Sequence, residues 1–255
     1  HEVSLPTSSY SLPQAKLAAE ERWSFEYISS LDDEMSQAVR LGDLFAVRRG
    51  VATGNNGVFV LNETQANELD PNRDFLRLLV PRPRDVTSSG VIREVAMEKR
   101  RWLIDTRADM AFIRERAPLL AQHLDASRGS IERSALASRR RPPFDMRADL
   151  ESILLFVYMM KSSGTRDNRR FLLNPKGLVP LNNYLIMDPL PHLASLLESR
   201  SWDFVLLDAL RAVPDTEFAR VGRHYGNGLV KLEPRDLCQV RFRLPSGLRE
   251  LLLED

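Results

Sequence analysis

The sequence contains a single cysteine and no long apolar run. Because Cys238 has no second cysteine to pair with, no disulfide can form within the chain, and this predicts a reducing, cytoplasmic setting. No apolar stretch reaches the roughly 18 residues that a membrane-spanning helix needs, so we expect no contact with a membrane. A hydrophobic content of 43% over 255 residues is nevertheless enough to bury a core.

Motifs of catalysis are also scarce. No two of the histidines, and no histidine with the cysteine, have the spacing of metal ligands: His1, His123, His192 and His224. No GxSxG motif occurs, and the Gly/Asn-rich stretch 50–57 is neither a GxGxxG nor a GxxxxGK[ST] loop. Residues 141–144 superficially resemble the NPPF tetrapeptide of amino-methyltransferases but lack its asparagine. We therefore predict no catalytic residue and no metal site.

What the sequence does contain is an uneven distribution of charge. The formal net charge is +1, but residues 1–38 carry seven acidic side chains against Lys16 and Arg22, a net of −5. The remaining residues carry 34 basic and 28 acidic side chains, a net of +6, and arginine supplies most of the positive charge. Arginine-rich surfaces favour contacts with phosphates and base edges. We expect an acidic helical connector over residues 1–38 and a mildly basic domain over residues 39–255.

Apolar periodicity and turn residues predict a mixed α/β chain whose elements interleave without a steady βαβ rhythm. The expected strands or apolar elements are 45–49, 58–61, 75–80, 101–105, 153–160, 171–173, 184–187 and 229–232. The expected helices are 14–30, 64–69, 110–123 with a break near Pro118, 193–197, 204–213 and 248–253. Loops are expected at 50–57 and 222–228, and a stiff extended segment at 81–84.

The stretch 166–189 combines these features. Its two apolar runs, Phe171–Leu173 and Tyr184–Met187, predict two strands joined by a Pro/Gly turn, and a basic cluster precedes the first. Arginine suits phosphate, and asparagine offers a donor and an acceptor that together can bind an adenine edge. The same asparagines could instead organise the turn.

Four blocks, in one order along the chain, carry a resemblance to a known family. They are Leu41–Leu44 with Gly50–Leu61, Pro81–Arg84, Arg170–Asn174 with Asn182–Leu185, and Val221–Pro234. Over roughly residues 39–240 the chain resembles the C-terminal target-recognition (specificity) region of TaqI-like N6-adenine DNA methyltransferases of restriction–modification systems, a class that includes phage-defence methylases. One departure is that Arg141 leads into Pro142-Pro143-Phe144, where the family usually has an aromatic pair.

The resemblance implies a target-recognition-domain-like fold of short twisted sheets with surrounding helices and no Rossmann catalytic domain. It implies double-stranded DNA as a partner, and a catalytic methyltransferase domain, in cis or in trans, that would bind S-adenosylmethionine; no cofactor is expected in this chain. The expected phosphate contacts are Arg48, Arg49, Arg139, Arg140, Arg169 and Lys231. The expected base-reading residues are Thr53, Asn55, Asn56, Arg82, Arg84, Arg223, His224 and Tyr225, together with Asn174, Asn182 and Asn183 if these do not organise the turn.

Three alternatives stay open at the level of sequence. A type I restriction specificity subunit has domains with a similar Leu-Gly-Asp-Leu start, although this chain shows no internal repeat. A small metal-dependent nuclease could use the loosely spaced carboxylates of Asp85, Glu94 and Glu98. A protein-interaction adaptor could carry a basic face that serves solubility alone.

Overall fold

The computed structural model describes residues 38–87, 89–148, 153–161, 170–197 and 202–253. The chain divides into two units, residues 1–36 and 37–255, and every described residue belongs to the second. The expected helix 14–30 and the expected phosphate contact Arg169 lie outside the described residues.

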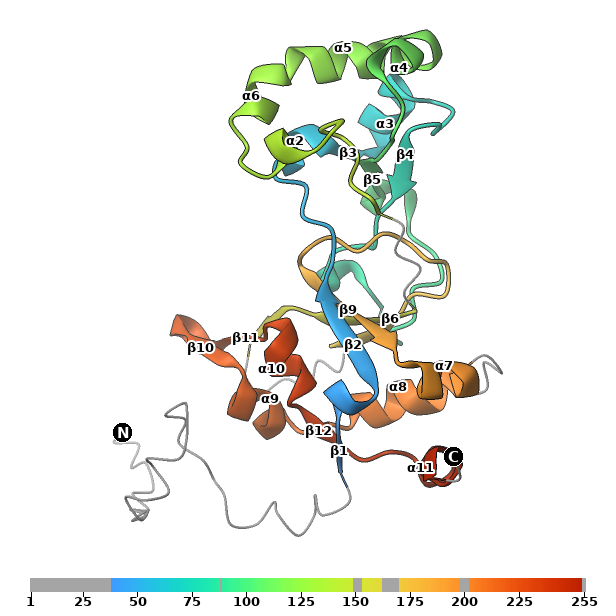
Figure 1. Ribbon diagram of the computed structural model, residues 1–255, viewed down its shortest axis with the longest axis vertical. Coiled ribbons are helices and arrows are strands. Elements are labelled where there is room, and N and C mark those ends of the chain that lie inside the picture. Colours follow the sequence, from blue (N-terminus) through green and yellow to red (C-terminus); the bar gives the residue numbers. More distant parts are fainter. Residues whose placement is uncertain (1–37, 88, 149–152, 162–169, 198–201, 254–255) are drawn as a thin grey trace, which may run out of the picture. The chain divides into compact units, whose positions relative to one another are not determined.

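Four small sheets account for the strands of the described residues, and all their strand pairs are antiparallel (Figure 1). The largest has the order β2–β9–β6–β8, with bounds Phe45–Arg49, Tyr184–Pro189, Leu154–Val157 and Phe171–Leu173. The next has the order β3–β5–β4, with bounds Val60–Asn62, Arg101–Ile104 and Leu76–Leu78. The third has the order β10–β11–β7, with bounds Arg223–Tyr225, Leu229–Lys231 and Met159–Lys161. The last pairs β1, Val39–Arg40, with β12, Arg241–Phe242.

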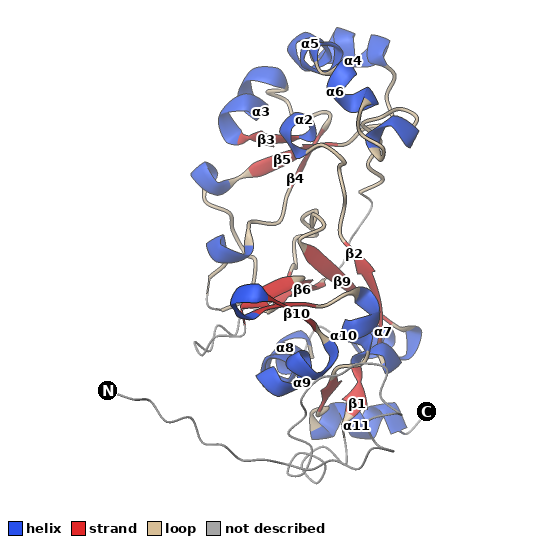
Figure 2. Ribbon diagram, turned by 90° about the vertical axis from the view of Figure 1, so that its left-hand side faces the viewer, coloured by secondary structure: helices blue, strands red, loops and turns tan. Residues whose placement is uncertain are grey.

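Short helices surround these sheets (Figure 2). The α-helices are α2 Asn56–Phe59, α3 Glu63–Leu69, α4 Met110–Arg116, α5 Pro118–Ala126, α6 Arg128–Glu132, α7 Pro191–Leu197, α8 Asp203–Arg211, α9 Asp215–Val221, α10 Pro234–Cys238 and α11 Ser246–Leu253. The 3-10 helices are η1 Leu41–Asp43, η2 Pro83–Asp85, η3 Met97–Lys99, η4 Ala137–Arg139 and η5 Gly226–Gly228. The prediction of a mixed α/β fold with short sheets and surrounding helices is confirmed, and no Rossmann-like sheet occurs in the described residues.

The two faces of the four-stranded sheet bury different apolar clusters. Along β6, Leu154 and Phe156 face one cluster, whereas Leu155 and Val157 face another, which is the alternation expected of a strand. The first cluster also takes side chains from α7, α8, α9 and α10. A third cluster fills the space between the β3–β5–β4 sheet and helices α3 to α6. Because β6 is covered on both faces, its sequence is a continuous apolar run.

Several elements agree with their predicted bounds to within two residues. Strands β2 and β11 and helices α3, α7, α8 and α11 are confirmed. The predicted break near Pro118 is confirmed as well, because α4 ends at Arg116 and α5 begins at Pro118, where a proline fits the first turn of a helix. No helix in the described ranges has both the length and the apolar character needed to cross a membrane.

The predicted hairpin of β8 and β9 is wrong. Both strands exist, but β6 lies between them and pairs with each. The segment that joins them turns after β8 but does not return to pair with it, because Val179 forms a parallel bridge to Leu79 and Leu181 forms one to Val51. These long-range pairings carry the chain away from β8 before β9 begins.

Two further predictions are corrected. The strand expected at 58–61 begins only at Val60, because the Asn55 carbonyl accepts hydrogen bonds from the backbone of Val58 and Phe59 and closes the turn of α2. The loop expected at 222–228 contains strand β10, which pairs with β11. All three residues of β10 are exposed, so the sequence shows no alternation that would reveal a strand.

Candidate nucleic-acid interface

One pocket brings together residues from four separate segments. It has a volume of about 530 Å³ and is lined by Asn56, Arg82, Pro83, Arg84, Arg101, Leu181, Asn182 and Asn183. Five of these residues are predicted DNA contacts: Asn56, Arg82, Arg84, Asn182 and Asn183. No acidic side chain of the described residues is among those that line it. We call these eight residues the arginine pocket.

Hydrogen bonds join the segments that form the arginine pocket. The buried Tyr184 hydroxyl donates to the Pro81 carbonyl at 2.6 Å, and burial raises the pKa of this phenol. The Val51 amide donates to the Pro180 carbonyl at 2.8 Å, and the Asn182 amide donates back to the Val51 carbonyl at 2.9 Å. The backbone before β9 is therefore fixed, and with it the positions from which the two pocket asparagines project.

The segment 81–84 is extended only as far as Arg82, so its prediction is corrected in part. Pro83–Asp85 forms the 3-10 turn η2, closed by a hydrogen bond from the Asp85 amide to the Arg82 carbonyl at 2.8 Å. Proline suits the first position of such a turn because its φ is already set. Arg82 and Arg84 are both exposed, and neither guanidinium has a hydrogen bond or ion pair within the described part of the chain.

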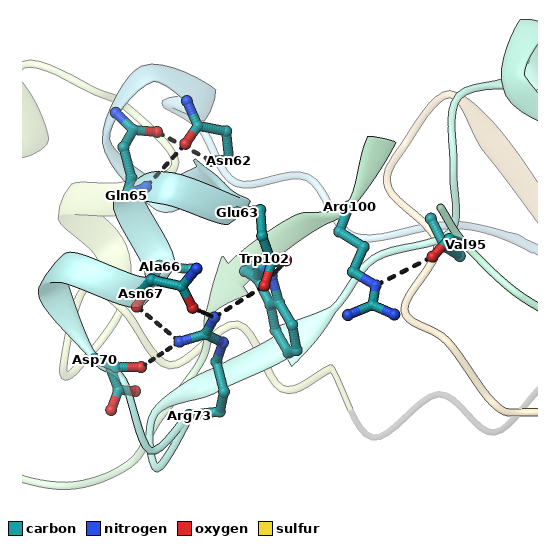
Figure 3. A network of polar contacts seen from close by, with 10 residues as sticks. All are labelled: Asn62, Glu63, Gln65, Ala66, Asn67, Asp70, Arg73, Val95, Arg100 and Trp102. Carbon is teal, nitrogen blue, oxygen red and sulfur yellow. Dashed lines mark hydrogen bonds and ion pairs between the residues drawn. The ribbon is translucent and has the colours of Figure 1, made fainter. Parts of the chain in front are cut away.

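Strand β5 is fixed by a polar network around Trp102 (Figure 3). The Trp102 indole Nε1 donates to Glu63 Oε2 at 2.7 Å. The Arg73 guanidinium lies over the Trp102 ring at 4.7 Å from the centroid, donates to Glu63 Oε1 at 3.1 Å, and also donates to two main-chain carbonyls. Because neighbouring residues of a strand point to opposite faces, holding Trp102 on one face directs Arg101 to the other.

Arg101 is a site residue that sequence reasoning missed. Burial lowers the pKa of its guanidinium and the nearby positive charges of Arg82 and Arg84 lower that pKa further, while Tyr184 and Asp85 act in the opposite direction. A half-buried arginine at this position is therefore repelled by neighbouring positive charge, and a bound anion or a group rich in hydrogen-bond acceptors would reduce that repulsion. The one signal in the sequence is a second arginine pair at the start of an apolar strand, Arg100 and Arg101, which by itself predicts only an exposed strand end.

The loop 53–56 presents Asn56 to the pocket and is held by its own side chains. The Thr53 hydroxyl is buried, accepts from the Asn55 amide at 3.1 Å, and donates to Asn56 Oδ1 at 2.6 Å. Asn55 Nδ2 donates to Ser130 Oγ at 2.7 Å. Gly54 has φ +80°, the left-handed conformation that glycine adopts without strain. Thr53 and Asn55, both predicted to read bases, thus contact protein groups in this structure.

Arg140, a predicted phosphate contact, holds the same loop from the other side. Its Nη1 donates to the Thr53 carbonyl at 2.8 Å and its Nη2 donates to the Ala52 carbonyl. The Ser134 hydroxyl adds a hydrogen bond to the Gly54 carbonyl at 3.0 Å. Burial lowers the pKa of Arg140. Its position supports the loop, whereas the neighbouring Arg139 is exposed.

Two other predicted phosphate contacts, Arg49 and Lys231, meet at one carboxylate. Glu233 Oε2 accepts from Arg49, and Glu233 Oε1 accepts from the Tyr158 hydroxyl at 2.8 Å and from Lys231 Nζ at 2.9 Å. Both cations also lie over the Tyr158 ring, at 5.3 and 5.1 Å from its centroid. Burial raises the pKa of Glu233, but the hydrogen bonds from Lys231, Arg49 and Tyr158 outweigh it and bring that pKa to about 2. We call these four residues the Glu233 cluster; it carries one net positive charge.

The remaining predicted residues lie elsewhere. Arg48 forms a two-point ion pair with Asp188 across the β2–β9 pair, with Nε to Oδ2 at 2.5 Å. Asn174 is buried and bonds both main-chain groups of Leu178, so it organises the turn after β8. The exposed strand β10 carries Arg223, His224 and Tyr225, and His224 Nε2 is 2.8 Å from the Ala219 carbonyl oxygen. Within the described residues, His, Cys, Asp and Glu side chains form no group of three that could bind a metal.

Comparison with known proteins gives one clear sequence relative. The chain is 28% identical over 242 residues to the type II methyltransferase M.XamI of Xanthomonas campestris pv. amaranthicola. The aligned region covers 94% of this chain. The chain spans 42% of the length of that relative. Among solved structures, the chain is similar to the type IIL restriction-modification enzyme MmeI in complex with DNA, with 17% sequence identity and a TM-score of 0.44. The match covers 81% of this chain and 24% of the MmeI chain. No model of a protein family matches.

Proposed function

We propose that this chain is a sequence-specific DNA-binding domain, the target-recognition part of an N6-adenine DNA methyltransferase or of a fused restriction–modification enzyme. The observation that carries the proposal is the arginine pocket, where three guanidinium groups and three asparagine amides from four segments line one volume without a carboxylate. Sequence similarity over 94% of the chain to a type II methyltransferase supports it. Because the chain spans 42% of that relative, the S-adenosylmethionine site and the methyl transfer would belong to a catalytic domain in cis or in trans.

The proposed mode of binding divides the basic residues between two tasks. Arginines and asparagines in the arginine pocket contact base edges, because they present hydrogen-bonding groups on a rigid backbone. Exposed cations outside it, such as Arg139, contact phosphates and set the affinity for any sequence. Adenine methylation would then require the target base to rotate out of the duplex into the partner catalytic domain.

The test is selection of bound DNA from a random duplex pool at two salt concentrations, followed by sequencing. We expect enrichment of one short motif, with affinity that falls as salt rises. The variant Arg84→Ala is expected to weaken binding to that motif by about 1–3 kcal/mol, roughly 5- to 150-fold, and to relax one base position. The matched variant Arg139→Ala, at an exposed arginine outside the pocket, is expected to weaken all sequences alike.

Other outcomes would point to other functions. Salt-insensitive binding without enrichment would contradict the proposal and favour a protein-interaction adaptor. Cleavage of plasmid in the presence of magnesium would favour a nuclease. A two-part motif with a fixed spacer, recovered only as a complex of two copies, would favour a type I specificity-subunit-like domain.

The Glu233 cluster provides a second test through its salt dependence. The variant Glu233→Gln removes the carboxylate shared by Arg49 and Lys231 and leaves both cations free to contact phosphates. We expect it to tighten binding to unrelated DNA and to steepen the slope of log affinity against log salt by about 1 to 2, since each phosphate contact contributes about 0.9. Filter binding at five salt concentrations measures that slope.

The matched control is Asp125→Asn. Asp125 is also shared by two cations, Arg114 at 2.9 Å and Arg128 at 3.3 Å, but these lie on helices that do not line the arginine pocket. Both variants remove one negative charge and release two arginine or lysine side chains. An equal steepening in both would show that the effect is one of net charge alone, and it would remove Arg49 and Lys231 from the DNA interface.

A further inference from the structure

We infer that the arginine pocket reads guanine. This inference rests on the proposed function and goes beyond it, because it names the base that the site selects. The pocket differs from an ordinary basic patch in that hydrogen-bond donors outnumber free acceptors: its three guanidinium groups only donate, and the amide oxygen of Asn56 is already engaged, which leaves the oxygens of Asn182 and Asn183 as its side-chain acceptors. Among the four bases, guanine alone presents two acceptors, O6 and N7, side by side in the major groove.

The donor set begins with the guanidinium groups. Arg82 precedes the η2 turn and Arg84 lies in its middle, with Pro83 between them, and neither guanidinium has a hydrogen bond or ion pair in the described part of the chain. Arg101 approaches from β5, and its hydrogen bond to the Val80 carbonyl is long, at 3.5 Å. An arginine cannot accept a hydrogen bond, so these three residues select a group rich in acceptors.

Asn56 becomes a donor through its neighbour. The Thr53 hydroxyl accepts from the Asn55 amide and gives its own hydrogen to Asn56 Oδ1 at 2.6 Å. Thr53 is 3% exposed and its backbone is held by Arg140, so this orientation is fixed. The amide oxygen of Asn56 is therefore engaged, while both hydrogens of Nδ2 are unused within the described residues.

The apolar part of the pocket lining favours a base over a phosphate. Pro83 and Leu181 contribute apolar walls, which suit the flat face of a base and offer nothing to a phosphate oxygen. The turn that carries Arg82 and Arg84 is stiff because proline fixes its φ, so the main-chain positions from which the two guanidinium groups project are set in advance. Two-point contact of an arginine fork with O6 and N7 depends on such a fixed position.

The experiment first selects the motif with the 255-residue chain and then changes single atoms of the bound DNA. Each guanine of the motif is replaced in turn by 7-deazaguanine, which lacks the N7 acceptor. We expect one position at which this change weakens DNA binding by the wild-type protein at least tenfold. At the same position it should weaken DNA binding by Arg84→Ala or by Arg82→Ala less than twofold. Such non-additivity shows that the arginine and the N7 atom interact.

Two additional comparisons separate a base contact from a phosphate contact. Arg84→Lys keeps the charge but loses the planar fork, so we expect it to lose the preference for guanine while keeping affinity for unrelated DNA. Thr53→Val, which removes the hydroxyl that orients Asn56, is expected to reduce the same preference. Circular dichroism and the urea midpoint of each variant establish that it is folded.

The outcomes are distinct. If no motif is enriched, the proposed function fails. If a motif is enriched but no guanine position couples to Arg82 or Arg84, the proposed function stands and the guanine inference is wrong. If a neutral methylphosphonate in the DNA backbone couples to these arginines instead, the arginine pocket binds phosphate, and the inference is again overturned.

Discussion

Replacement of Gly50 by alanine is expected to destabilise the domain by about 3 kcal/mol, the upper end of the cost of overpacking. A Cβ atom at this position would lie 2.3 Å from the Leu181 carbonyl oxygen and 2.6 Å from that of Pro180. Both are main-chain atoms, which cannot move aside by a change of rotamer. The clash would break the bridge between Val51 and Leu181 and displace the two asparagines that follow it.

Urea unfolding and selection of DNA measure the two consequences of Gly50→Ala together. We expect a lower unfolding midpoint and, in the folded fraction, loss of the enriched motif with retention of salt-dependent binding. Gly226→Ala is the matched control, because no atom lies within 4 Å of its added Cβ and its φ is not in the left-handed region. A Gly50→Ala protein that selects the same motif as wild type would show that the segment before β9 does not read DNA.

The second large effect is expected at Glu217. This carboxylate is 2% exposed, lies 2.8 Å from Arg241 Nη2 and 2.9 Å from Arg220 Nη2, and also accepts from the Arg241 amide at 3.1 Å. Glu217→Ala would leave two partly buried guanidinium groups without their counter-charge, at a cost of about 3 kcal/mol. Asp125→Ala removes an exposed carboxylate that also pairs with two arginines, and we expect it to leave the urea midpoint unchanged.

Glu217 also predicts how stability depends on pH. Burial raises its pKa, but the hydrogen bonds from Arg241 and Arg220 outweigh burial and bring the folded-state pKa to about 2, below the ordinary value of 4.5. Its contribution to stability is therefore complete above pH 4.5 and is lost as the pH falls toward 2. Urea midpoints between pH 5 and pH 2 should fall more steeply for wild type than for Glu217→Ala. Parallel slopes would show that Glu217 is not the group that titrates.

Local patterns predicted local structure well. The apolar start of β2 and the proline that separates α4 from α5 each depend on neighbours in the sequence. The pairing of β6 between β8 and β9 depends on contacts between segments far apart, so no local pattern indicates it. Strand β10 was not predicted for a different reason, since a strand exposed on both sides has no apolar periodicity.

The candidate site shows the same difference between features that the local sequence predicts and features that depend on the fold. The residue types predicted Arg82, Arg84, Asn182 and Asn183 as surface groups with binding chemistry, and the fold brings them to one pocket. Residue type alone could not distinguish Arg139, which is exposed, from Arg140, which turns inward to hold a loop. It also could not assign Arg101 to the pocket, because its direction depends on the network around Trp102.

The contacts that hold the loop 53–56 have an evolutionary consequence. Arg140 and Ser134 donate to the main-chain carbonyls of Ala52, Thr53 and Gly54. Every amino acid supplies the same carbonyl, so these bonds do not depend on which side chain stands at position 56. A substitution at Asn56 removes the hydrogen bond from the Thr53 hydroxyl but leaves these main-chain bonds in place. Under the proposed function, a lineage under pressure to change its DNA target could therefore vary position 56 while the main-chain frame of the loop is kept.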